Sequence, residues 1–285
     1  MPDNDSNREI CSPYRGYPLA VRIPLPRGEL SDWLVAVLRG RRPPRSWPVP
    51  AMSSYPPAWE DHDLQLALWC CYELHYRGFD DVSEEWEWSP EIINFRGLLE
   101  RRWLADVRCL AGDLPDVVAA EVPRTLADLV RRSAGSDLSG FLCREADHDQ
   151  FAEYLAHRSV YQLKEADPHS FGVPRLCGPA KAALVEIQTD EYGCGRPQRM
   201  HAELFRATMR WLKLDDEYGH YVPVVPAVTL AISNLMSTFG LHRRWLGALL
   251  GHLAALEMTS ATPPPVRLAA IPVARIFWAV ELSFR

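Results

Sequence analysis

Residues 161–209 read YQLKEADPHSFGVPRLCGPAKAALVEIQTDEYGCGRPQRMHAELFRATM, and their pattern decides the fold. A helical pattern leads to a stop at Pro168, resumes from about Gly178 to Tyr192, and continues after a glycine- and proline-rich break at residues 193–197. Proline cannot continue a helix, and glycine and proline together are where helices kink or end. The stretch therefore predicts successive helices, with the last two joined across an irregular break.

The same 3.6-residue pattern extends outward from this stretch in both directions. It predicts further helices over residues 28–38, 61–76, 90–111, 125–134, 138–145, 147–167 and 241–259. Few segments alternate with period 2, and no repeat recurs at a fixed period. We therefore expect an all-α fold, a single up-and-down helical bundle over residues 58–260. A proline-rich arm with one short helix would precede it (1–57), and an atypical tail would follow it (261–285).

Composition excludes several classes of protein. The chain has 285 residues and a formal net charge of -6, which argues against broad nucleic-acid or anionic-membrane binding. No apolar run is long enough to cross a membrane, and the N-terminus has no apolar signal-peptide core. The seven cysteines are an odd number without CxxC spacing, which fits scattered thiols in a reducing compartment. We therefore expect a cytoplasmic protein.

Three residues are candidate metal ligands, because helical bundles hold iron with Glu, Asp and His from facing helices. Glu165 falls four residues after Tyr161 on a mostly apolar face, where an acid is costly to bury unless it is paired or metal-bound. A solvated carboxylate at a helix end is the alternative reading. Glu191 shares a face with Leu184, whereas His201 follows ten positions later.

Glu191 and His201 do not share a face on a straight helix. Ten residues leave them roughly 80° apart. The break at residues 193–197 could supply the missing rotation. A packed surface histidine remains the alternative reading of His201.

Other polar residues have simpler explanations. His252 and Glu257 are five apart and so not on one stripe. They are expected to pack in the core or to contact the metal ligands rather than the metal, although either could replace a ligand. His169, His157 and the pair Glu73–His75 are expected to be polar groups in the core or at helix ends.

Four segments resemble the iron-containing redox enzymes of the heme-oxygenase-like diiron oxidase superfamily. They are DLQLALWCCYELHYRGF, YQLKEADPHSFGVPRL, AKAALVEIQTDEYGCGRPQRMHAELF and FGLHRRWLGALLGHLAALEMTS, and the resemblance spans roughly residues 28–260. It implies a heme-oxygenase-like bundle with Glu165, Glu191 and His201 as metal ligands. It further implies two ferrous ions, dioxygen as co-substrate and oxidation of a small organic substrate. It leaves room for an external electron donor and a homodimer.

Two departures from the family pattern bear on this implied function. Some members carry an extra carboxylate three residues before the histidine, where this chain has Gln198, a neutral amide. The family also completes its site from a late helix of His-x3-Asp-x2-His type. Here no histidine follows His252 and no aspartate follows Asp216. The alternative hypothesis is therefore a non-catalytic or metal-deficient member of the same fold, because losing ligands weakens metal binding.

Overall fold

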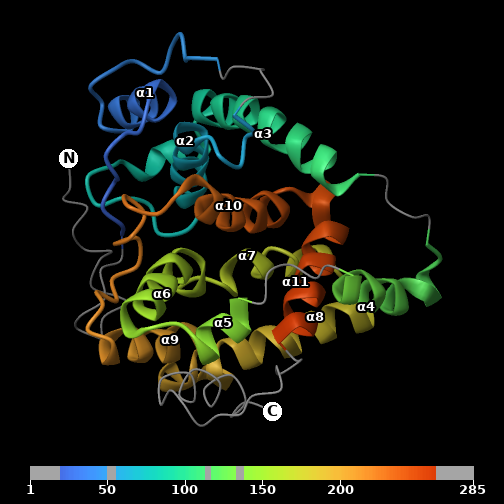
Figure 1. The fold of residues 1–285 in the computed structure, drawn as a ribbon. Helices are drawn as coiled ribbons and strands as arrows, with labels where there is room; N and C mark the ends of the chain where they lie inside the picture. The colour runs from blue at the N-terminus through green and yellow to red at the C-terminus, as the bar shows by residue number, and fades with distance from the viewer. Residues whose placement is uncertain (1–19, 50–55, 113–116, 133–137, 261–285) are drawn as a thin grey trace.

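The computed structural model describes residues 20–49, 56–112, 117–132 and 138–260, and Figure 1 shows that helices dominate this part of the chain. The helices are α1 (Glu29–Leu38), α2 (His62–Glu73), α3 (Pro90–Ala111), α4 (Val122–Arg132), α5 (Leu138–Arg144), α6 (His148–Gln162), α7 (Asp167–Ser170), α8 (Gly178–Glu191), α9 (His201–Trp211), α10 (Ala227–Leu241) and α11 (Leu246–Ser260). Within the described ranges β-pairing is limited to one bridge, Val21 to Phe79. The predicted all-α fold is confirmed.

The core forms around α2 and α10, and Figure 1 shows α10 near the centre of the molecule with α2 above it. Asp61 caps α2 by accepting hydrogen bonds from the backbone amides of Asp63 and Leu64. Every residue of α2 from Leu64 to Glu73 is buried, because α1, α3 and α10 all pack against it. This agrees with its sequence, which is apolar nearly all round.

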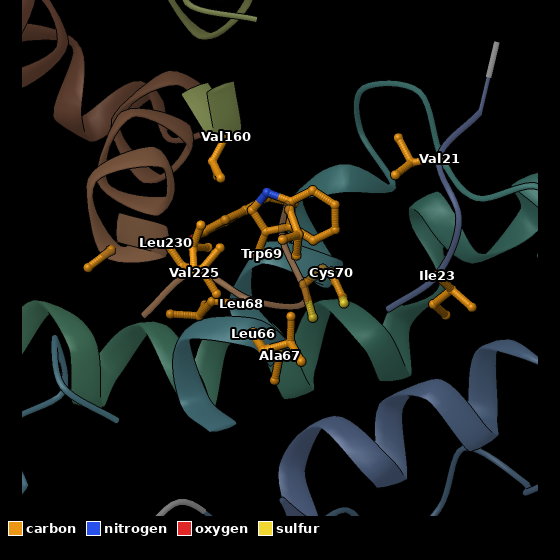
Figure 2. Packing of buried hydrophobic residues seen from close by; sticks show 14 of the residues in the cluster. Val21, Ile23, Leu66, Ala67, Leu68, Trp69, Cys70, Val160, Val225 and Leu230 are labelled. Carbon is orange, nitrogen blue, oxygen red and sulfur yellow. The ribbon is translucent and has the colours of Figure 1, made fainter. Parts of the chain in front are cut away.

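One apolar cluster joins the two halves of the chain. It includes Trp69 of α2, Val160 of α6 and Leu230 of α10, all 1% exposed or less. Figure 2 shows these side chains together in the packed interior. Because α10 also packs on α6 and α7, it connects the N-terminal core to the C-terminal half of the protein.

The helix predicted over residues 147–167 ends earlier than expected. α6 stops at Gln162, and residues 163–166 form a turn before α7. Pro168 lies in the first turn of α7 rather than ending α6. Proline is favoured there because its missing N–H would have no partner in a helix anyway. Glu165 therefore lies on an irregular turn, where its direction differs from that of a helical residue.

The break between α8 and α9 is confirmed. Two short 3-10 turns, Gly193–Gly195 and Pro197–Arg199, separate these helices. Gly193, Cys194 and Gly195 all have positive φ, at 64°, 54° and 74°. No helix in the described part of the chain combines the length and apolarity that a membrane span requires. The tail predicted at residues 261–285 lies outside the described residues.

Candidate metal centre

The three residues predicted as ligands line a single cavity. Glu165, Glu191 and His201 all border a space of about 70 Å³. Its walls come from the turn after α6, the end of α8, the start of α9 and Arg77, which follows α2. Segments far apart in the sequence therefore meet at this cavity.

Glu191 and His201 are in direct contact despite the angle between them in a straight helix. Glu191 ends α8 and His201 begins α9, and Glu191 Oε2 lies 2.9 Å from His201 Nδ1. Their side chains are 13% and 30% exposed, respectively. The break therefore does what the sequence suggested: it turns the chain so that both residues face one point.

The break depends on the backbone at Arg199 and Met200 passing close to Gly193. A Cβ added there would lie 2.6 Å from the carbonyl carbon of Arg199 and 2.7 Å from the amide nitrogen of Met200. With its positive φ of 64°, this position admits only glycine without strain. Gly193 thus lets the chain fold back on itself just before His201.

The acidic surroundings of His201 favour its charged form. Its pKa is raised, first by the polar contact with Glu191 and then by the charges of Glu191, Glu165 and Glu257, while burial opposes the shift. The imidazole therefore lies in a field that attracts cations. Glu257 contributes to this field although its side chain is exposed.

Glu165 and its neighbour Lys164 are held in different surroundings. The amide of Gln162 donates a hydrogen bond to Glu165 at the cavity. Lys164 is buried, with Nζ 3.2 Å from Glu73 Oε2 and 4.1 Å from the ring centroid of Tyr76. The Tyr218 hydroxyl donates to the same Glu73 oxygen at 2.7 Å. This buried ion pair anchors the turn that carries Glu165.

A hydrogen-bond network connects that turn to the helix carrying Glu191. The Tyr192 hydroxyl donates to Asp167 Oδ1 at 2.9 Å and lies 3.1 Å from the Ser170 hydroxyl. The Gln188 amide donates to the Ala166 carbonyl at 2.8 Å and to Ser170 at 2.7 Å. The network fixes the spacing between the Glu165 turn and the end of α8.

His169 of α7 and His252 of α11 form a stacked pair outside the cavity. Their rings stack with centroids 6.4 Å apart, and His169 is 1% exposed. Burial lowers the pKa of His169 to about 4, with a further contribution from His252, and burial also lowers the pKa of His252. Neither borders the cavity. They pack as the sequence suggested.

Some residues that line the cavity were not singled out from the sequence. Arg77, Gln162 and Tyr192 border the cavity. All three lie in segments that carry the family resemblance, but their spacing did not single them out as site residues. Gln198, at the position of the extra carboxylate, is exposed and does not border the cavity.

The donor types fit iron, but the set is partial. Carboxylates and imidazoles are the ligands that helical bundles use for this metal. Glu191 Oε2 is buried and accepts no well-aligned hydrogen bond from the described residues, as expected of an oxygen placed to meet a cation. Within those same residues, no three His, Cys, Asp or Glu side chains are grouped tightly enough to hold one ion. Glu191 and His201 are in direct contact, and Glu165 borders the same cavity.

The family comparison covers this part of the chain. Residues 152–275 match the model of a family described as iron-containing redox enzymes. The match includes Glu165, Glu191 and His201. No curated protein matches the chain. The resemblance read from the opening stretch is therefore confirmed over residues 152–275, which are similar to the iron-containing redox enzymes.

Proposed function

We propose that the protein is an iron-dependent oxidase or oxygenase that activates dioxygen and oxidises a small organic substrate. One observation carries the proposal: Glu165, Glu191 and His201 border the same cavity, within the segment that matches the iron-containing redox enzymes. The shared cavity supports a common task for three residues that sequence spacing alone left uncertain.

Each residue has a distinct role in this proposal. Glu191 and His201 would hold one iron, since they already present an oxygen and a nitrogen 2.9 Å apart. Glu165, which borders the same cavity, would bind or bridge a second iron. Bound iron supplies redox chemistry and positions open to exogenous ligands. The protein's own contribution is to fix these three donors.

Two structural features would keep the donors in place. The buried pair of Lys164 and Glu73 holds the turn that carries Glu165. The Tyr192–Asp167 hydrogen bond ties that turn to the end of α8. Groups that orient ligands in this way strongly influence metal affinity.

The alternative function is that of a metal-deficient member of the family. It is favoured by the lack of a three-donor cluster among the described residues. Such a protein would keep the fold and bind a small molecule through Glu165 and His201. The two functions differ in iron content and in their response to dioxygen.

The test is anaerobic loading with Fe(II), removal of unbound metal, and mixing with oxygenated buffer. We expect close to two irons per chain, as in carboxylate-bridged helical bundles, and dioxygen uptake that follows the iron content. Negligible iron with intact helicity by circular dichroism would contradict the proposal and support the metal-deficient alternative. Bound iron without dioxygen uptake would contradict the oxidase assignment alone.

A further inference from the structure

Arg77 is a cationic residue at the cavity that the proposed metal site does not use. It lies just beyond α2 and borders the cavity together with Glu165, Glu191 and His201. Arg77 lies in the segment DLQLALWCCYELHYRGF, which carries part of the family resemblance, but its spacing does not single it out as a site residue. Its place beside the candidate ligands comes only from the fold, which brings the end of α2 against the turn after α6.

The guanidinium of Arg77 is held in position by an aromatic ring. It lies 4.6 Å from the ring centroid of Tyr218, a distance at which cation and ring attract each other. Tyr218 is itself fixed, because its hydroxyl donates to the buried Glu73. The side chain of Arg77 is therefore oriented by stacking, which leaves the edges of the guanidinium available for hydrogen bonds.

No described residue accepts a hydrogen bond from the edges of this guanidinium. Among the described residues, no carboxylate lies within 4.0 Å of the Arg77 guanidinium and none accepts a hydrogen bond from it. Asp167 is near enough for the two charges to interact. Its Oδ1 instead accepts a hydrogen bond from Tyr192.

The other two cations at the cavity are already engaged. Lys164 pairs with Glu73 at 3.2 Å. Arg206 lies 3.2 Å from Glu203 and donates to the backbone carbonyl of Asp216. Arg77 therefore differs from both in having donors directed to no acceptor in the described part of the protein.

A guanidinium of this kind suits one class of ligand. Its planar fork matches a carboxylate and can bind it through two parallel hydrogen bonds. Once iron neutralises Glu165 and Glu191, an anion entering the cavity would no longer be repelled by them. We propose that Arg77 binds the carboxylate of the substrate and thereby selects small organic acids, an inference that rests on the proposed iron site in the same cavity.

The test compares acids with their uncharged amides. Binding of benzoate, benzamide, hexanoate and hexanamide to the anaerobic Fe(II)-loaded protein would be measured by isothermal titration calorimetry. We expect each acid to bind at least about 10-fold more tightly than its amide, as charge-assisted hydrogen bonds imply. Arg77→Met should abolish this preference while keeping an apolar side chain against Tyr218. Arg77→Lys should retain part of it, and Arg101→Met, which removes an exposed arginine of α3, should leave it unchanged.

Three outcomes would overturn the inference. The first is an acid preference that survives in Arg77→Met, and the second is the absence of acid binding to the iron-loaded wild type. The third is tighter binding of inorganic phosphate than of either acid through Arg77, which would assign the residue to phosphate. Thermal melts of all variants check that they are folded.

Failure of the iron site is measured separately. Iron content is determined on the same samples, and the titrations are repeated without metal. A chain that binds no iron but discriminates benzoate from benzamide through Arg77 would sink the proposed function and the need for iron in acid binding. It would keep Arg77 as the residue that binds the carboxylate. Normal iron content together with an unchanged acid preference in Arg77→Met would overturn the role of Arg77 and leave the proposed iron site standing.

Discussion

Lys164 and Glu165 are neighbours in sequence but lie in different surroundings. Lys164 is 3% exposed and pairs with Glu73, which is fully buried. Glu165 borders the cavity. A regular helix would separate their directions by only about 100°. The irregular turn after α6 gives each its own environment.

Removing one partner of the buried pair should be strongly destabilising. Lys164→Met leaves Glu73 charged and buried, and we expect it to lower the free energy of unfolding by about 3–5 kcal/mol. Lys164→Met/Glu73→Gln should recover part of this loss. Arg210→Met breaks an exposed pair with Asp216 and should cost no more than about 1 kcal/mol. Urea denaturation measures all three, and equal losses for the two single variants would contradict this account.

His75 makes the stability of the fold depend on pH. Its Nε2 lies 2.5 Å from Arg96, and its pKa is lowered from the ordinary value of 6.5, chiefly by burial and then by Arg96. The unfolded chain therefore binds a proton at higher pH than the folded protein does. The stability associated with neutral His75 is complete above pH 6.5 and is lost as pH falls through the lowered pKa.

The corresponding prediction concerns the change in stability between pH 7 and pH 5. His75→Gln keeps a group that can accept from Arg96 but cannot titrate in this range. Its urea midpoint should fall less than that of the wild type on acidification. Identical falls in the two proteins would show that His75 does not contribute.

At the scale of elements, the break between α8 and α9 forms the site. The two helices contribute Glu191 and His201 from their facing ends. Two of the three positive-φ positions in the break are glycines, but only Gly193 has backbone atoms within 3 Å of where a Cβ would be. The two glycines therefore have different roles, which a matched pair of variants can separate.

Gly193→Ala and Gly195→Ala should differ in their effects. Gly195→Ala adds a Cβ in open space and should cost about 1–2 kcal/mol for its positive φ. Gly193→Ala adds a clash with the backbone at Arg199 and Met200, so it should cost more and should weaken iron binding. Denaturation and iron titration measure these effects. Equal behaviour of the two variants would show that the close approach at Gly193 is unimportant.

The link between α7 and α8 should affect the metal more than the fold. Tyr192→Phe removes the hydroxyl that donates to Asp167. We expect a stability loss of about 1 kcal/mol and a roughly 10-fold weaker iron affinity, since such outer partners orient ligands. Ser83→Ala, which removes a cap of a 3-10 turn away from the cavity, is the control. A normal iron affinity in Tyr192→Phe would contradict the orienting role.

At the scale of the whole molecule, the periodic part of the fold was predictable and the turns were not. The pattern of apolar residues predicted the helices around α2, α3, α8 and α11. It placed Glu165 on a helix because Pro168 looked like a stop, whereas a proline in a first turn equally begins a helix. Local spacing cannot separate these two readings, because proline is compatible with both.

The sequence predicted three residues of the candidate site: Glu191 and His201, which are close in sequence, and Glu165, which the family resemblance supported. Glu191 and His201 could be connected through the glycine-rich break between them. Arg77 could not, because only the packing of α2 against α10 and of α10 against α6 and α7 sets its place. The function proposed here therefore rests on long-range packing as much as on the motif.

Comparison of two variants on α8 tests most directly whether the cavity holds iron. Glu191→Gln removes a carboxylate from the cavity, whereas Glu186→Gln removes an exposed one from the same helix. Iron per chain would be measured after anaerobic Fe(II) loading and gel filtration. We predict that the wild type and Glu186→Gln retain equal amounts and that Glu191→Gln binds at least about 10-fold more weakly. Equal iron in all three proteins, or none in the wild type, would contradict the assignment of Glu165, Glu191 and His201 as the iron site.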